Sequence, residues 1–577
     1  MKTGSFAYVW ATLALVAALP TYAENPTRVY WGDTHVHSEL SGDAYALGTR
    51  LTPDDAYRFA KGEKVLATGG QEVQLRRPLD FLMVADHAEN LGVLPRLVAD
   101  DDFLSGDEVS EHWRELLAAL PPLPEILNAA TFDAFSQELQ PLYQAKKAAA
   151  ADYPISKTFQ QSVWQKVGEV AERHYAPGTF TTFIGYEWSA SDAAMIHRNV
   201  LFADGPDVTN RTLPFSALDS RDVEDLWAYL GRYEEELGGS AIAIPHNGNL
   251  SKGSMFALRT FLGEPLSKAY AEQRARWEPI YEVTQIKGDG ETHPLLSPTD
   301  EFADFETWPP EVWGGTPKGE PSSYARSALK LGLDQEIELG ANPFKFGMIG
   351  STDAHTGLAT ADEDLYWGKM GLTEPSRYRA QDQWYYSASG YAAVWAEENT
   401  RESLFAAMKR KETYATTGPR MVVRFFGGWE YAAEDIESED VAALGYAKGV
   451  PMGGDLASAP EGKAPRFLVY AIKDPDGANL NRIQIVKGWR DAKSELHEQV
   501  FNVAMSDGQG VWELSTVWQD PDFDESSPAF YYARVLEIPT PRWTAYDAKE
   551  YGLKDLPEEI PMTVQERAYT SPIWYTP

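Results

Sequence analysis

The sequence contains no cysteine among its 577 residues. A chain without cysteine forms no disulfide bonds and has neither a thiolate nucleophile nor a thiolate metal ligand. Its stability therefore has to come from burial of apolar side chains, and a chain of this length suffices for two or more domains. Aromatic residues make up 12% of the composition, which favours a well-packed globular protein over a disordered one.

Positive charge is scarce relative to negative charge. The chain has 51 Lys and Arg residues against 86 Asp and Glu residues, which gives a formal net charge of −35. This charge opposes non-specific binding to nucleic acids or anionic membranes, so we expect no duplex nucleic acid as a partner. A small anionic substrate stays compatible with it, because bound metal ions reverse the sign of the potential locally.

Long apolar runs are missing, apart from one near the N-terminus. Lys2 precedes the stretch YVWATLALVAALP, which is too short to span a bilayer comfortably, and Ala23 before Glu24 is a small-residue cleavage site. This pattern predicts a signal peptide over residues 1–23 and an exported protein, periplasmic or extracellular. An N-terminal anchor helix is the alternative. We expect no transmembrane segment in the mature chain.

Short apolar runs that end in polar clusters dominate residues 24–420. Runs such as PLDFLMVADH are typical of buried strands, and stretches such as DVEDLWAYLGRYEEELG of helices. Their alternation predicts an α/β domain with polar residues at the carboxyl ends of its strands, where barrel-type proteins place active sites. Residues 100–175 predict a helical insertion, either a wall over the site or a packing decoration. Residues 421–577 predict a mostly β domain, interpreted as a sandwich.

Histidine is rare, with 10 residues in the chain, yet six of the ten lie at or beside the ends of predicted strands. His35 and His37 are two positions apart, so on a strand they share one face and can chelate one divalent ion. Nitrogen and oxygen donors without sulfur suit zinc, manganese or iron. Nine ligands exceed the need of one ion, so we expect two or three divalent ions with Glu187 as a bridge. The predicted metal ligands are His35, His37, Asp43, His87, Glu187, His197, His246, Asp353 and His355.

The motifs DTHVHSELSGD, VADH, GYE, IHRNVLF, PHNGN and STDAH together resemble the PHP superfamily, named for polymerase and histidinol phosphatase. The resemblance covers roughly residues 28–420. It implies a distorted (β/α) barrel with a trinuclear metal centre, in a superfamily that mostly hydrolyses phosphate esters. The stretches TYATTGPR, DPDG and RAYTSPIWYTP resemble a secreted branch whose barrel carries a C-terminal β domain, a family catalogued as a domain of unknown function.

The resemblance also implies how the ligands divide among three ions. Asp43 departs from many members of the superfamily, which have histidine at this position, so the second ion is the one whose site differs. The implied sets are His35, His37, Glu187 and Asp353 for the first ion, Asp43, His87 and His355 in or beside the second site, and Glu187, His197 and His246 for the third.

Together these features predict an exported multinuclear metal-dependent hydrolase, foremost a phosphoesterase that cleaves monoesters or diesters with metal-bound hydroxide. Asp353 and Glu187 are the predicted catalytic residues: Asp353 orients the water or accepts its proton, and Glu187 bridges the ions. Asp86, next to His87, is expected to fix the tautomer of an imidazole. The predicted substrate is a small anionic ester, and the residues predicted to hold it are Arg198, Lys252, Lys287 and Arg420.

Two other functions fit the same residues. An activated water also attacks carbon or sulfur, so hydrolysis of an amide, a carbamate or a sulfate ester is the first alternative. A non-catalytic envelope protein that binds metal or carbohydrate, with tryptophans of the β domain stacking on sugars, is the second. The sequence carries no signal for an oligomeric state.

Overall fold

The computed structural model describes residues 25–99, 155–191, 194–312 and 319–577, and between 99 and 155 also residues 115, 123–129, 131, 133–137 and 140. The predicted signal peptide, residues 1–23, and most of the predicted helical insertion lie outside these residues. No helix in the described part of the chain is long and apolar enough to cross a membrane.

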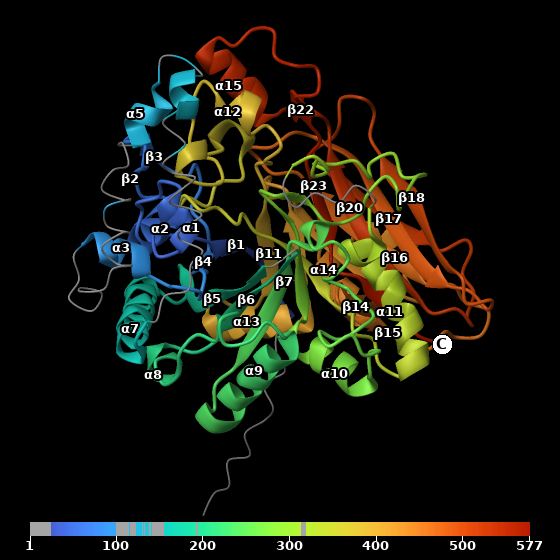
Figure 1. Ribbon diagram of the computed structural model, residues 1–577. Helices are drawn as coiled ribbons and strands as arrows, with labels where there is room; N and C mark the ends of the chain where they lie inside the picture. The colour runs from blue at the N-terminus through green and yellow to red at the C-terminus, as the bar shows by residue number, and fades with distance from the viewer. Residues whose placement is uncertain are drawn as a thin grey trace, which may run out of the picture.

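A large mixed sheet forms the centre of the molecule and takes strands from both the first and the last part of the chain (Figure 1). Strands β17 (Leu480–Arg490) and β18 (Leu496–Met505) extend this sheet from β20. The order of the other strands is β15 (Asp455–Leu456), β24 (Ile573–Tyr575), β20 (Ala529–Glu537), β23 (Arg567–Thr570), β12 (Thr413–Thr416), β11 (Tyr391–Ala396), β1 (Arg28–Val36), β4 (Phe81–Val84), β5 (Thr181–Ser191), β6 (Met195–Phe202) and β7 (Ala241–His246).

Only part of this sheet is parallel. Strands β1, β4 and β5 pair in parallel, whereas β5, β6 and β7 form an antiparallel meander and β1 pairs antiparallel with β11. Strand β5 ends at Ser191 and β6 begins at Met195, which leaves no length for the crossover that a parallel pair needs. The mixed α/β class is confirmed, but uniform alternation of strand and helix is not what the chain forms.

The strands β8 (Ile280–Gln285), β9 (Gly288–Asp289) and β10 (Gly347–Gly350) form a separate small sheet in which β8 and β10 are parallel. An isolated parallel bridge joins Val36, the last residue of β1, to Ala354 after β10. The carboxyl ends of β1 and β10 therefore meet, although hydrogen bonds among the described strands do not close a barrel.

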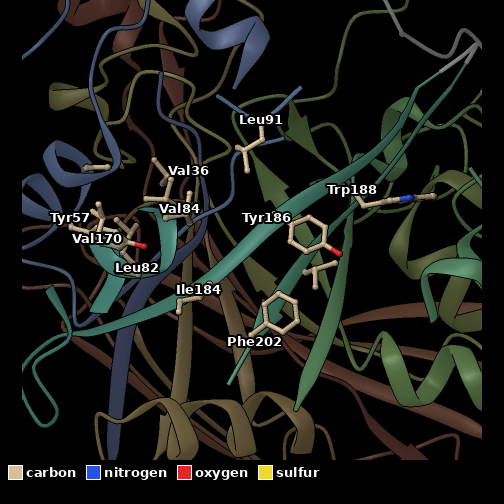
Figure 2. Packing of buried hydrophobic residues seen from close by; sticks show 14 of the residues in the cluster. Val36, Tyr57, Leu82, Val84, Leu91, Val170, Ile184, Tyr186, Trp188 and Phe202 are labelled. Carbon is tan, nitrogen blue, oxygen red and sulfur yellow. The ribbon is translucent and has the colours of Figure 1, made fainter. Parts of the chain in front are cut away.

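Alternate residues of β4 enter two different cores, which explains why its sequence FLMV is continuously apolar. Leu82 and Val84 belong to a cluster with the helix residues Tyr57 and Val170, and Figure 2 shows these side chains close together. Phe81 and Met83 belong to a cluster on the other face, which also contains residues of β5, β6, β7 and β11. Both faces of this strand are buried, and its carboxyl end is held rigidly in place.

Helix α7 (Lys157–His174) covers the first of these cores. The side chain of Ser156 accepts a hydrogen bond from the backbone N–H of Phe159 and caps the helix. Buried residues recur along the helix at intervals of three or four, as in Phe159, Val163, Val167 and Val170, and face the sheet. The end of the predicted helical insertion is thus a core helix.

The other helices surround the sheets: α8, α9 and α10 lie on the side of the meander, and α11 lies beside β17 (Figure 1). Their bounds are α1 (Gly42–Ala46), α2 (Pro53–Ala60), α3 (Val93–Val98), α5 (Leu123–Leu127), α8 (Pro206–Thr209), α9 (Val223–Leu237), α10 (Lys268–Trp277), α11 (Ala325–Leu339), α12 (Arg379–Asp382), α13 (Arg401–Arg410), α14 (Val441–Lys448) and α15 (Trp543–Tyr551).

The part of the chain after residue 420 is mostly β. A second sheet packs on the main sheet through a core that includes Trp31, Phe425, Phe467 and Tyr531. Because β12 pairs with β23, the main sheet contains strands from both sides of position 420. The strands of the second sheet are, in order, β14 (Gly449–Pro451), β13 (Val422–Gly428), β16 (Arg466–Ile472) and β19 (Glu513–Gln519).

A buried ion network also joins the two parts of the chain. Both arginines in it are fully buried: Arg326 lies 2.5 Å from Glu291 and 2.8 Å from Asp300, and Arg534 of β20 lies 2.7 Å from Asp300. Removing one member would leave an uncompensated buried charge. The network therefore fixes the position of the C-terminal strands on the first part of the molecule.

Candidate metal centre

The nine predicted ligands converge where several strands end. His35 lies in β1, Glu187 in β5, His197 in β6 and His246 at the end of β7. His197 and His246 are directly opposite each other in the β6–β7 ladder. An isolated parallel bridge between His87 and Glu187 brings the segment after β4 to the same place. The remaining ligands follow β1, β4 and β10 or lie in α1: His37, Asp43, His87, Asp353 and His355.

The first implied ligand set surrounds a point between two imidazoles. The Nε2 atoms of His35 and His37 lie 3.1 Å apart, and Oε2 of Glu187 lies 3.6 and 3.2 Å from them. The Oδ1 atom of Asp353 lies 3.4 Å from both Nε2 atoms. The backbone of Asp353 has φ of 56°, a left-handed conformation that costs energy in a non-glycine residue and clusters at functional sites.

The other two sets adjoin the first one: Glu187 belongs to the third set and contacts His87 of the second. Its Oε1 atom lies 2.6 Å from Nδ1 of His197 and 2.8 Å from Nε2 of His246. Its Oε2 atom lies 3.0 Å from Nδ1 of His87. Glu187 therefore touches ligands of every set, as a bridging carboxylate must.

Asp43 lies between the two histidines of the second set. Its Oδ1 atom is 3.4 Å from Nε2 of His87, and its Oδ2 atom is 3.2 Å from Nε2 of His355. His37, His87 and His355 also form a group with donor atoms within 4.8 Å of one another. Asp43 thus provides a carboxylate that reaches both imidazoles of this set.

Hydrogen bonds to the outer nitrogens orient His35 and His37. The Nδ1 atom of His35 lies 3.0 Å from Glu282 of β8, and the Nδ1–H of His37 donates to Ser41 at 2.8 Å. The hydroxyl of Ser41 in turn donates to Asp86. A histidine that donates from one ring nitrogen presents the lone pair of the other to a metal. Asp86 therefore acts on His37 through Ser41, not on its neighbour His87.

Electrostatics favours the neutral form of most imidazoles at the centre. His87 is the exception: burial lowers its pKa, but Glu187 and Asp43 outweigh burial and raise that pKa well above the usual value. Burial lowers the pKa of His197 to about 4, and burial together with His37 and Lys369 lowers the pKa of His355 to about 3. Burial also holds the pKa of His35 well below its usual range. Neutral imidazole is the form that binds a metal.

Negative charge is in excess at the same place. Burial raises the pKa of Glu187, but the imidazoles of His87, His197 and His246 outweigh burial and hold that pKa well below its usual value. Burial and the nearby carboxylates Asp353 and Asp33 raise the pKa of Glu282 well above its usual range. The centre thus concentrates carboxylates that a bound cation would stabilise in their ionised form.

The donor set fits divalent metal ions. Among the described residues, Oε2 of Glu187 is a buried carboxylate oxygen with no hydrogen-bond partner, and such atoms are rare unless water or an ion satisfies them. Four groups of buried or nearly buried donors at the centre have atoms within 4.8 Å of one another, and Glu187 belongs to two of these groups. Nitrogen and oxygen donors in this density suit zinc, manganese or iron.

A family profile matches residues 24–511 and 506–577, which is nearly the whole chain. The chain belongs to the family described as "Protein of unknown function (DUF3604)". No curated protein and no solved structure matches it.

In this DUF3604 chain, a cavity of about 360 Å³ opens over the metal centre. Asp43, His87, His197 and His355 line it, so the second set and one histidine of the third set face the cavity. The rest of its wall includes the cations Lys287, Lys369 and Arg221, the apolar residues Met195, Leu218 and Met370, and the polar residues Glu89, Asn90, Ser189 and Ser191.

Of the four cations predicted to hold substrate, the structure places only Lys287 at the centre, where its Nζ contacts Oδ2 of Asp353. Arg198 follows His197 on β6 and therefore points to the opposite face, where it pairs with Glu278 at 3.0 Å. Lys252 is exposed to solvent. The guanidinium of Arg420 donates to the backbone carbonyls of Arg77 and Pro78. These three residues do not line the cavity.

Two residues of the centre, Glu282 and Lys369, were not predicted from the sequence. Glu282 is a single carboxylate in the apolar run PIYEVTQ, and this placement of an acid in a buried strand was a usable signal. Lys369 lies in the loop sequence YWGKMG, which carries no periodic pattern. Its Nζ lies 2.5 Å from Oδ1 of Asp353 and 2.9 Å from Nδ1 of His355, and burial lowers its pKa to about 7.

Proposed function

We propose that this protein is an exported metal-dependent hydrolase of the PHP type that cleaves phosphoesters. The observation that carries the proposal is the convergence of nine nitrogen and oxygen donors around Glu187 beneath a cavity with two buried lysines. Such a density of ligands exceeds what a structural ion needs. A distorted barrel is part of the proposal, and the bridge between the end of β1 and the segment after β10 supports it.

Divalent ions at this centre would lower the pKa of a bound water and stabilise negative charge on the ester. Glu187 contacts residues of all three ligand sets, and these sets fit two or three such ions. The chain itself fixes the donors: Glu282 and Ser41 hold the rings of His35 and His37 in the orientation that turns their Nε2 atoms inward. Ligands fixed in advance lose little freedom when an ion binds.

Lys287 and Lys369 give the site its preference for anions. Both ammonium groups contact Asp353 and both line the cavity. Burial lowers the pKa of Lys287, but Asp353 and Glu187 outweigh burial and raise it, so Lys287 stays charged at neutral pH. A phosphoryl oxygen that enters the cavity would contact the ammonium group of Lys287 beside the predicted metal ligands. Hydrogen bonds between charged groups are stronger than those between neutral groups.

Asp353 is placed to orient the attacking water during hydrolysis. Burial raises its pKa, but His35, Lys287 and Lys369 outweigh burial and hold the pKa well below the usual range, so the carboxylate is ionised. It lies at the meeting point of the first ligand set and the two lysines. We propose that Asp353 orients the attacking water by accepting a hydrogen bond from it, because a carboxylate with so low a pKa is a weak base.

The test combines metal content with activity. The mature protein is purified, its metals are counted by mass spectrometry, and monoester, diester, sulfate ester and amide substrates are assayed. We expect two or three metals per chain and turnover of a phosphoester. His37→Ala and Asp353→Ala should both lose this turnover, whereas His497→Gln, in the C-terminal hairpin, should keep it.

Each other outcome decides against a part of the proposal. Turnover of only sulfate or amide bonds would keep the metal centre and reject phosphorus chemistry. A metal-loaded protein that hydrolyses none of the four classes would favour the binding function. A folded protein that takes up no divalent metal would reject the proposal entirely.

A further inference from the structure

A second cavity shares no lining residue with the cavity over the metal centre, and it is strongly acidic. It has a volume of about 140 Å³, and seven of its fifteen lining residues are Asp or Glu. Residues 361–364 line it from the first part of the chain, and residues 474–478, Glu537 and Glu566 line it from the last part. Both parts of the molecule therefore contribute to one acidic cavity.

Two arginines neutralise only part of this charge. Arg76 pairs with Asp364 at 2.6 Å. Arg77 contacts Asp474 and lies 2.9 Å from Asp476. The third arginine of the region, Arg542, pairs with Glu306 at 2.7 Å.

Three glutamates of the cavity have no salt-bridge partner among the residues that the structure describes. Oε2 of Glu363 accepts the backbone N–H of Trp543, and Oε2 of Glu566 accepts the hydroxyl of Thr417. Glu537 accepts only the backbone N–H of Ala478, at 3.1 Å, through Oε2. Neutral donors of this kind leave the carboxylate charge uncompensated.

Glu537 provides the decisive observation. Its side chain is 1% exposed, and its Oε1 atom has no hydrogen-bond partner in the described structure. This oxygen faces Gly477, where an added Cβ atom would lie 2.6 Å from it, and both residues line the cavity. A buried carboxylate oxygen without a donor costs free energy unless water or a cation satisfies it.

The ionisation behaviour of the three glutamates agrees with a missing positive charge. Burial raises the pKa of Glu363 and of Glu537 to about 8, despite Arg542 near the former and Lys473 near the latter. Burial and the carboxylate of Glu363 raise the pKa of Glu566 well above its usual range. A cation in the cavity would lower these pKa values and stabilise the ionised carboxylates.

We propose that this cavity binds a divalent cation of the calcium type through Glu363, Glu537 and Glu566. All candidate donors are oxygen atoms, which calcium prefers, whereas the histidine-rich centre suits transition metals. Among the described residues, none of the three belongs to a group whose donor atoms lie within 4.8 Å of one another. Water molecules therefore lie between the ion and some of these carboxylates. Because Glu363 comes from the first part of the chain and the other two from the last, the ion links the two parts. This inference is independent of the proposed hydrolase activity.

The experiment uses the full mature chain with its transition metals in place. Calcium chloride is titrated by calorimetry into protein dialysed against calcium-free buffer, and the melting temperature is recorded with and without about 1 mM calcium, a concentration typical for extracellular sites. We expect one calcium ion per chain and a higher melting temperature with calcium. Glu537→Gln and Glu363→Gln should each weaken binding at least about tenfold, a loss of about 1.4 kcal/mol.

Glu439→Gln, at an exposed position, is the matched control and should bind like the wild type. Circular dichroism checks that every variant is folded. Glu→Gln keeps the size of the side chain, so a folded Glu537→Gln variant that binds calcium with unchanged affinity would overturn the proposal. So would a wild-type protein that shows neither binding heat nor a shift in melting temperature at about 10 mM calcium, above the range of the weakest known sites.

Discussion

Glu282 sets the orientation of His35 from outside the ligand sets. Its carboxylate lies 3.0 Å from Nδ1 of His35 and is fully buried. Outer partners of this kind typically change metal affinity by about 10–100-fold. We therefore expect Glu282→Gln to fold normally and to lose metal to a chelator at about 10–100-fold lower chelator concentration. Competition with a chromophoric chelator measures this change.

Glu397→Gln, an exposed change, serves as the control for that competition. If Glu282→Gln held its metals as tightly as this control, the carboxylate would not orient His35 in the way described.

Lys287 and Lys252 allow a sharp test of substrate recognition, because the sequence analysis predicted both and the structure separates them. Lys287 contacts Asp353 in the cavity, whereas Lys252 is exposed elsewhere. We expect Lys287→Met to lower kcat/KM for an anionic ester by about 10–100-fold, which corresponds to about 1.4–2.7 kcal/mol. Lys252→Met should leave it unchanged. Equal effects in steady-state assays of the two variants would contradict the assignment.

The ligand set could be predicted at the level of single residues because its members stand where apolar runs end. The motifs around His35, Glu187 and His246 mark these ends directly. The ends of apolar runs did not indicate which of the predicted cations lie near the centre. Arg198 is next to a ligand in sequence, but adjacent residues of a strand point to opposite faces, so nearness along the chain was misleading. Lys369 reaches Asp353 from a loop without any pattern.

At the scale of elements, α7 shows how the metal centre is supported from behind. Trp164 is 1% exposed, and its indole N–H donates to the carbonyl of Thr209. It packs edge-on against Tyr186, which precedes Glu187 in β5. We expect Trp164→Ala to lower the free energy of unfolding by about 3–5 kcal/mol through the cavity it leaves. Urea unfolding followed by circular dichroism measures this loss.

Lys166→Ala on the same helix is the matched control, because this lysine side chain is 62% exposed. Its free energy of unfolding should stay within about 0.5 kcal/mol of the wild-type value. A loss of similar size in both variants would contradict the assignment of this stability to core packing of Trp164, since alanine is the better helix former at both positions.

The sequence predicted the strands and helices of the first part better than their directions. An apolar run such as FLMV reports burial on both faces, and a parallel strand and a central antiparallel strand look alike in this respect. The short connection between Ser191 and Met195 was the available sign that β5 and β6 are antiparallel. Glu187 lies inside β5 and His197 near the start of β6, so these two residues are not at the carboxyl ends of their strands as expected. The meander nevertheless brings His197 and His246 next to Glu187.

On the scale of the whole molecule, strands distant in sequence share one sheet. β12 and β23 pair although about 150 residues separate them, and no local pattern in either strand encodes its partner. The sequence pattern changes after residue 420 from alternating strands and helices to mostly strands, and this change was visible in the sequence. The continuity of the main sheet across that position was not, since it depends on long-range pairing.

The ion network of Asp300 tests how firmly the two parts are joined. Burial raises the pKa of Asp300, but Arg534 and Arg326 outweigh burial and hold that pKa well below its usual value. A carboxylate whose pKa is lower in the folded protein stabilises it above its unfolded pKa, about 4, and loses this contribution as the pH falls through the folded value. Stability should therefore drop steeply below about pH 4.

Asp300→Asn isolates this contribution, because it leaves two buried arginines with fewer counter-charges. We expect a loss of about 3–5 kcal/mol at pH 7 and a shallower decline on acidification than in the wild type. Urea unfolding at several pH values between about 3 and 7 spans the range where the carboxylate titrates in the unfolded chain. Asp304→Asn, at an exposed position nearby, should keep the wild-type pH profile. If Asp300→Asn also kept that profile, the link between the two parts would rest on sheet pairing and apolar packing instead of on the buried ions.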